Sequence, residues 1–113
     1  KDVSFIPYIF MYHNLLKLIT NFSRMNKKPE IIRNKADHSI LIAPENPKNS
    51  LIWLHGLGDS SEGFFDYFLE DNSPVYQGTR VLLLQAPDRP VTINGGMACN
   101  SWYDIKGLGS TKE

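Results

Sequence analysis

Residues 51–60 read Leu-Ile-Trp-Leu-His-Gly-Leu-Gly-Asp-Ser, and this stretch decides the predicted fold. Its first four residues form a continuous apolar run, which predicts a strand buried on both faces of a sheet. Gly56 and Gly58 then predict a tight turn, because glycine allows positive φ and close approach of a ligand to the backbone. Apolar residues at helical spacing follow between residues 64 and 69. We therefore expect a strand, a turn and a helix in this order.

Two further apolar runs, residues 39–43 and 81–84, predict neighbouring strands. A strand, a helix and a strand between residues 51 and 84 imply a right-handed parallel crossover. Residues 27–37 are polar and predict a loop or an edge segment, and residues 88–113 predict mostly loop. The fold class that follows is α/β, with a mostly parallel sheet and flanking helices.

The N-terminal residues differ from the rest in composition. Apolar residues from Tyr12 to Phe22 recur at a spacing of three and four, and no acidic residue occurs between Asp2 and Glu30. An amphipathic, basic, acid-free leader is typical of organelle-targeting segments. Two alternatives are that these residues form a helix that packs on a neighbouring part of the protein, or that they are a translated leader sequence with no fold. We expect a leader over 1–24 and a domain over 25–113, with Met25 as a candidate initiator.

Composition excludes several classes of protein. The chain has 113 residues, 42% hydrophobic and 21% charged, which suits one globular domain. Twelve basic residues balance twelve acidic ones, so the overall charge gives no reason to expect a nucleic-acid or anionic-membrane partner, and the longest apolar run is too short for a stable membrane span. A single cysteine, Cys99, excludes a disulfide framework and favours a reducing, cytoplasmic location. Cys99 could be a palmitoylation or redox point, or an inert thiol.

The glycine-rich turn at 56–60 suits two kinds of chemistry. Backbone N–H groups at such a turn have no partners and can stabilise a phosphate or a developing oxyanion. Dinucleotide binding is disfavoured, because Ser61 replaces the third glycine of the phosphate motif and Asp59 brings negative charge. An oxyanion loop fits the preceding strand and the following helix, and an ordinary strand-to-helix connection is the alternative.

A second segment separates these alternatives. Residues 85–97 read Gln-Ala-Pro-Asp-Arg-Pro-Val-Thr-Ile-Asn-Gly-Gly-Met, and residues 101–105 read Ser-Trp-Tyr-Asp-Ile. With the Leu-His-Gly-Leu-Gly-Asp turn, they resemble the acyl-protein thioesterase and phospholipase/carboxylesterase family in both order and spacing. The resemblance covers residues 51–108, roughly half of the chain. It implies the N-terminal part of an α/β-hydrolase fold.

The resemblance also implies a function and its residues. Family members are serine hydrolases that cleave thioesters of S-palmitoylated proteins, carboxylic esters or lysophospholipids. By resemblance, the N–H of Leu57 is an oxyanion-hole donor, Gly56 and Gly58 shape its loop, and Leu57 and Trp102 are candidates to line the acyl channel. No cofactor and no metal are expected.

Other polar residues receive structural interpretations. His55 is expected to orient the loop, because in this fold the catalytic base comes last in the chain. Ser60 and Ser61 are interpreted as helix caps, and Asp59 as a residue that holds the turn. Arg89 and Asp104 are expected to pair and to pin the long loop.

The nucleophile motif G-x-S-x-G does not occur in the 113 residues. Nucleophile, acid and base are therefore not present in this chain, which we expect to be an incomplete, inactive fragment. Its sheet would carry an exposed edge that needs a packing partner. The alternative is a truncated, non-catalytic structural or interaction module.

Overall fold

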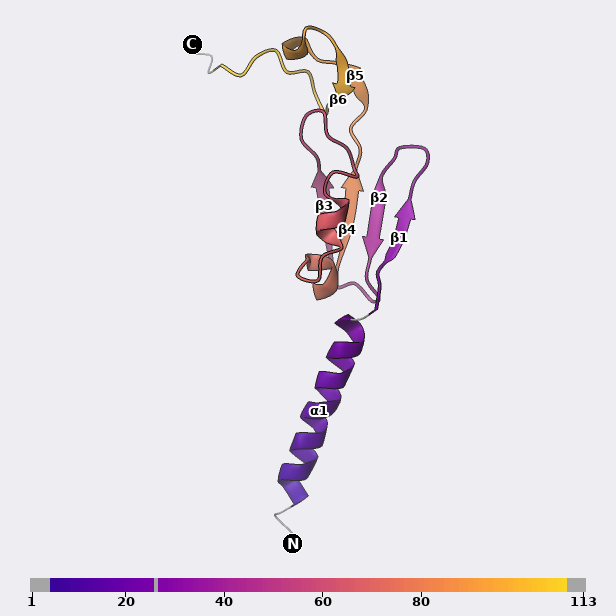
Figure 1. Cartoon of the computed structure of the whole chain (residues 1–113), viewed down its shortest axis with the longest axis vertical. Helices are drawn as coiled ribbons and strands as arrows, with labels where there is room; N and C mark the ends of the chain where they lie inside the picture. Colours follow the sequence, from indigo (N-terminus) through magenta and orange to yellow (C-terminus); the bar gives the residue numbers. More distant parts are fainter. Residues whose placement is uncertain (1–4, 26, 110–113) are drawn as a thin grey trace.

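The computed structural model describes residues 5–25 and 27–109, and it has the predicted α/β fold class. A long helix lies at one end, a four-stranded sheet in the middle and a two-stranded ribbon at the other end (Figure 1). In chain order the elements are α1 Phe5–Met25, β1 Glu30–Arg33, β2 Ile40–Ala43, β3 Asn49–Leu54, α2 Phe65–Phe68, the 3-10 turn η1 Pro74–Gln77, β4 Thr79–Leu84, β5 Asp88–Pro90, the 3-10 turn η2 Thr92–Asn94 and β6 Ala98–Asn100.

The sheet has the strand order β1-β2-β4-β3. The predicted crossover joins β3 to β4, which run parallel, with Leu51 opposite Val81 and Trp53 opposite Leu83. The other two pairings, β1 with β2 and β2 with β4, are antiparallel. In the described residues the sheet is therefore mixed, which corrects the expectation of a mostly parallel sheet. Between β3 and β4 lies the long connection that a parallel pair needs, whereas a short turn joins β1 to β2.

The core lies on one face of the sheet, under α2 and η1. Phe68 of α2 and Val75 of η1 are fully buried against strand side chains. The indole of Trp53 meets the ring of Phe68 edge-on, with centroids 5.5 Å apart. Alternate residues of the strands complete this face: Ile40 and Ile42 on β2, Leu51 on β3, and Val81 and Leu83 on β4.

The opposite face of β3 is open among the described residues. Ile52 is 59% exposed and Leu54 is 55% exposed, whereas Trp53 between them packs into the core. The prediction that β3 is buried on both faces is therefore wrong for this structure, where β3 is an edge strand. The apolar run is suited to burial on both faces, but the described part of the chain contributes a cover for only one.

Helix α1 begins earlier than predicted and stands apart from the core. It includes residues 5–11, and proline at position 7 is tolerated because it falls in the first turns. The side chains from Tyr8 to Thr20 are exposed. Within residues 5–25 and 27–109, no helix combines the length and the hydropathy needed to cross a bilayer. The first four residues of the predicted leader lie outside the described residues.

The segment after β4 is more ordered than predicted. Residues 88–100 were expected to be loop, yet β5 and β6 form an antiparallel ribbon with Arg89 opposite Cys99. The ribbon turns through Gly95 and Gly96, whose φ angles are 67° and 81°. Strands of three residues are too short to show an alternating apolar pattern, which is why the sequence did not reveal them.

Candidate functional site

The candidate site is the turn after β3. Because β3 and β4 run parallel, their carboxyl ends meet at one edge of the sheet, where ligands bind in open α/β folds. The turn at residues 55–61 leaves β3 there and meets Ala86, which follows β4. The end of β6 reaches the same place through Asn100. Two segments far from the turn in the sequence thus support it.

His55 joins the turn to the end of β4. Its side chain is buried, and its Nε2 accepts a hydrogen bond of 2.9 Å from the amide of Ala86. The ring proton is therefore assigned to Nδ1, which donates to the carbonyl oxygen of Gly56 at 2.7 Å. With both nitrogens engaged within the chain, the ring orients the loop, in agreement with its interpretation from sequence.

Asn100 holds the next part of the turn from outside. The amide of Gly58 donates to its carbonyl oxygen, and its Nδ2 donates to the carbonyl oxygen of Asp59, both at 2.9 Å. Within the turn, the amide of Asp59 donates to the carbonyl oxygen of Gly56 at 3.1 Å. Gly58 has φ of 75°, so its glycine is required by conformation.

Leu57 lies between these restrained residues. Its side chain is 44% exposed, and its position is three residues beyond the end of β3. Among the described residues, its N–H has no hydrogen-bond partner, whereas the amides of Gly58 and Asp59 are both engaged. A restrained turn with an unengaged amide can donate to a ligand or to a developing negative charge.

The described residues do not enclose Leu57. A cleft of about 940 Å³ borders the turn, but its lining comes from Ser60, Ser61, Gln85 and neighbouring segments rather than from Leu57. No group of three or more His, Cys, Asp or Glu side chains in the described ranges could hold a metal ion. The arrangement offers a backbone donor at Leu57.

The two serines of the turn are not helix caps, which corrects that prediction. Helix α2 begins at Phe65, so its N-cap residue is Phe64 rather than Ser60 or Ser61, and Phe64 makes no side-chain capping hydrogen bond. Ser61 instead joins two other segments. Its hydroxyl donates to the carbonyl oxygen of His38, and its amide donates to Gln85 Oε1. Asp59 holds the turn as expected, because its Oδ1 accepts the amide of Ser60 at 2.8 Å.

The loop near residues 101–105 is anchored differently from the prediction. Asp104 accepts hydrogen bonds of 2.8 Å from both the amide and the hydroxyl of Thr92. It forms no ion pair with Arg89, so the expected Arg89–Asp104 pair is wrong. Trp102 donates its Nε1 to the carbonyl oxygen of His55 at 2.9 Å and therefore lies beside the turn.

Sequence reasoning missed three residues that build this turn: Gln85, Asn100 and Gly63. Asn100 and Gln85 act across long sequence separations, which no local pattern reveals. A Cβ on Gly63 would meet the carboxylate of Asp59, so any larger residue here would displace that carboxylate from its place in the turn. The position of Gly63, four residues after Asp59, was the one feature of the sequence that could have indicated this close contact.

The comparisons with known proteins place this turn in a family. The model of the family described as Phospholipase/Carboxylesterase matches residues 35–113. Acyl-protein thioesterase 1 of Mycosarcoma maydis is 44% identical over 63 residues, 55% of this chain and 26% of the relative. Acyl-protein thioesterase 1 homolog 1 of Dictyostelium discoideum is 43% identical over 61 residues, 54% of this chain and 27% of the relative.

A solved structure agrees with these sequences. The crystal structure of Zea mays acyl-protein thioesterase 2 superposes with a TM-score of 0.52 and 26% identity, covering 74% of this chain and 31% of the maize chain. The chain thus spans about a quarter to a third of the length of these relatives. A chimaera in which residues 30–113 replace the corresponding maize segment would supply the remaining sheet for measurements.

His55 is expected to contribute to stability through the Ala86 amide. In the chimaera, His55→Leu should lower the free energy of unfolding by about 1–3 kcal/mol, because a buried amide loses its acceptor. Urea unfolding measures the change. His55→Gln retains a side-chain acceptor and should recover part of the loss. A His55→Leu chimaera as stable as its parent would show that the ring does not support the turn.

Asp104 is expected to make stability depend on pH. Hydrogen bonds from the amide and then the hydroxyl of Thr92 lower the pKa of its carboxyl in the folded state. A lowered folded-state pKa contributes stability above the ordinary carboxyl pKa of about 4, and this is lost as pH falls through the folded value. Urea unfolding of the Asp104→Asn chimaera should therefore vary less between about pH 5 and about pH 3.

The matched control for Asp104 is Asp88→Asn. Asp88 is an exposed carboxylate of β5 without a side-chain hydrogen bond in the part of the chain that the structure describes. This substitution should leave the acid dependence of unfolding nearly unchanged. Equal effects of the two substitutions would contradict the special role of the Thr92 contacts.

Proposed function

This chain belongs to the phospholipase/carboxylesterase family, and from that membership we propose that it supplies the oxyanion loop of a serine hydrolase. The reaction is acyl transfer to water, through a tetrahedral intermediate whose oxygen carries negative charge. In this proposal the N–H of Leu57 donates to that oxygen, and Gly56 and Gly58 shape the loop. The second donor belongs to the residue after the nucleophile, in a G-x-S-x-G segment.

One observation carries the proposal: the amide of Leu57 has no partner among the described residues in a turn that is otherwise restrained. Hydrogen bonds at Gly58 and Asp59 on one side and at His55 on the other limit how far it can move. A donor that is fixed before the reaction stabilises developing charge without the cost of reorganisation. This restraint is what an oxyanion hole requires and an ordinary connection does not.

The proposed substrates are thioesters of S-palmitoylated proteins, with carboxylic esters and lysophospholipids as further candidates. The matched relatives are named acyl-protein thioesterases, which supports the thioester class. Leu57 and Trp102 are proposed to line the acyl channel, because the exposed Leu57 side chain and the Trp102 indole flank the same turn. A cytoplasmic location and a reaction without cofactor belong to the same proposal.

A fluorophosphonate probe tests the assignment of roles. The 113-residue chain should not be labelled, because it contains no G-x-S-x-G, whereas the chimaera should be labelled at its host serine. Labelling of the 113-residue chain would mean that one of its own serines is the nucleophile. A folded chimaera that resists labelling would contradict a competent oxyanion loop.

A non-catalytic interaction module is the second candidate function, favoured by the open side of β3. This edge strand exposes Ile52 and Leu54 on a face that the described residues leave uncovered. Edge strands of this kind pair or pack with other chains. If the chain is an interaction module, it should form a stable complex of fixed stoichiometry with another protein chain, and Ile52→Lys should disrupt that complex. A monomeric chain without such a complex would remove this candidate.

A further inference from the structure

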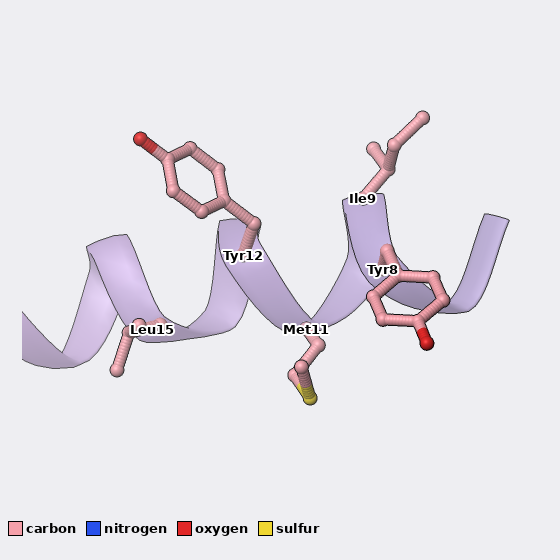
Figure 2. Close-up of a pocket in the computed structure, with 5 residues that line it drawn as sticks. All are labelled: Tyr8, Ile9, Met11, Tyr12 and Leu15. Atoms are coloured by element: carbon pink, nitrogen blue, oxygen red, sulfur yellow. The ribbon is translucent and has the colours of Figure 1, made fainter. Parts of the chain in front are cut away.

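Helix α1 has an exposed apolar surface that the proposed hydrolase chemistry does not use. Five apolar or aromatic side chains form it: Tyr8, Ile9, Met11, Tyr12 and Leu15. Figure 2 shows Ile9 and Tyr12 leaving one side of the helix, and Tyr8, Met11 and Leu15 leaving another. Each of these side chains is more than half exposed. Such a surface needs a partner.

The apolar surface continues along the helix as a wide band. Leu18 and Phe22 follow Met11 and Leu15 at spacings of three and four, which places them on the same side, and they are 69% and 66% exposed. Ile9 and Tyr12 widen the band around the helix (Figure 2). A helical partner covers a narrower seam, so a fluid apolar phase fits this band better.

The charge of this region has one sign. Lys17 lies on the opposite side of the helix from Leu15, since two positions turn the helix by about 200°. No acidic residue occurs between Asp2 and Glu30, while Arg24 and Lys28 add positive charge. Lys27 forms an ion pair with Glu45 at 2.7 Å, so its charge is balanced within the chain. A broad apolar band with a lysine opposite Leu15 and no acidic residue beside it is complementary to an anionic lipid surface.

We propose that α1 is an interfacial helix that lies in the surface of an anionic membrane. Its tyrosines suit the boundary between headgroups and acyl chains, because each has an apolar ring and a polar tip. Met11, Leu15, Leu18 and Phe22 enter the acyl region, and Lys17 stays among the headgroups. The inference uses only α1, so it does not rest on the proposed hydrolase function.

Flotation of the 113-residue chain with vesicles tests the proposal. We expect binding to vesicles with about one-third phosphatidylserine and much weaker binding to pure phosphatidylcholine vesicles. Binding should weaken at about 1 M salt, where charges are screened within about 3 Å. Tyr12→Trp should report entry into the apolar phase as a blue-shifted emission on the anionic vesicles, measured against the parent chain.

Two substitutions divide the contact into its parts. Leu15→Asp removes apolar area and should weaken binding about 30-fold. Lys17→Glu changes the charge by two and should also weaken it about 30-fold, but on phosphatidylserine vesicles at low salt alone. Leu108→Asp is the matched control, because Leu108 is 88% exposed outside α1, and its binding should be unchanged.

Three results would overturn the proposal. The first is a chain that does not float with anionic vesicles at low salt. The second is an equal loss of vesicle binding in Leu15→Asp and Leu108→Asp, which would indicate nonspecific hydrophobic adsorption rather than contact through α1. The third is lipid-free dimerisation that Leu15→Asp abolishes, detected by sedimentation equilibrium, because the apolar band would then be the interface with a second copy.

Discussion

Replacing Leu57 with proline in the chimaera is expected to lower kcat for a palmitoyl thioester about 100- to 1,000-fold. Proline lacks the N–H that we propose as an oxyanion donor, and loss of one such donor costs about 3 kcal/mol of transition-state stabilisation. The turn can accept the ring, because Leu57 is not among the residues with positive φ, and the preceding Gly56 has no Cβ to clash with a proline ring. Steady-state hydrolysis measures the effect, and KM should change far less than kcat.

Leu57→Ala is the matched control, because it keeps the amide and removes only the half-exposed side chain. Its kcat should stay within about tenfold of the parent, and a change of KM with acyl-chain length would place the side chain beside the acyl channel. Equal loss of kcat in Leu57→Pro and Leu57→Ala would contradict a role for the amide. The melting temperature of each variant should also be measured, because a collapsed turn would lower the melting temperature as well as kcat.

Replacing Phe68 with alanine is expected to lower the free energy of unfolding of the chimaera by about 3–5 kcal/mol. The ring is 1% exposed and fills the space between α2 and the sheet, where it meets Trp53 and Tyr67 edge-on. Removing it leaves a cavity that a short helix of four residues cannot close without breaking its other contacts. Urea unfolding followed by tryptophan fluorescence measures the loss.

Tyr67→Ala is the control for Phe68, because Tyr67 is an aromatic residue of the same helix that is 52% exposed. Its cost should be below about 1.5 kcal/mol, the usual size of one aromatic contact beyond burial. Phe68→Leu should lie between the two, since it keeps most of the apolar volume. A Phe68→Ala chimaera as stable as the Tyr67→Ala chimaera would contradict the position of the core.

The strands could be predicted where apolar residues run without interruption. The run at 81–84 became β4, which lies between two partners, and the run at 39–43 became β2. The run at 51–54 predicted β3 but not its exposure, because a sequence pattern indicates which faces favour burial and not which segment covers them. Ile52 and Leu54 therefore differ from Trp53, although all three are apolar.

The candidate site could be predicted in outline, because Gly56 and Gly58 after a strand indicate a turn with unengaged amides. Its supports could not be predicted. Asn100 reaches the turn from the end of β6, and His55 is oriented by an amide 31 residues later in the chain. Such contacts depend on how β4 and the ribbon return to the turn, which local spacing does not encode.

An oxyanion donor at Leu57 requires that its amide point at the reacting oxygen during the reaction. A crystal structure of the chimaera inhibited with a fluorophosphonate places a tetrahedral phosphonyl oxygen where the oxyanion forms. We predict that the nitrogen of Leu57 lies about 2.7–3.1 Å from that oxygen. A Leu57 amide that instead donates to another part of the protein, or faces away from the phosphonyl group, would contradict the proposal.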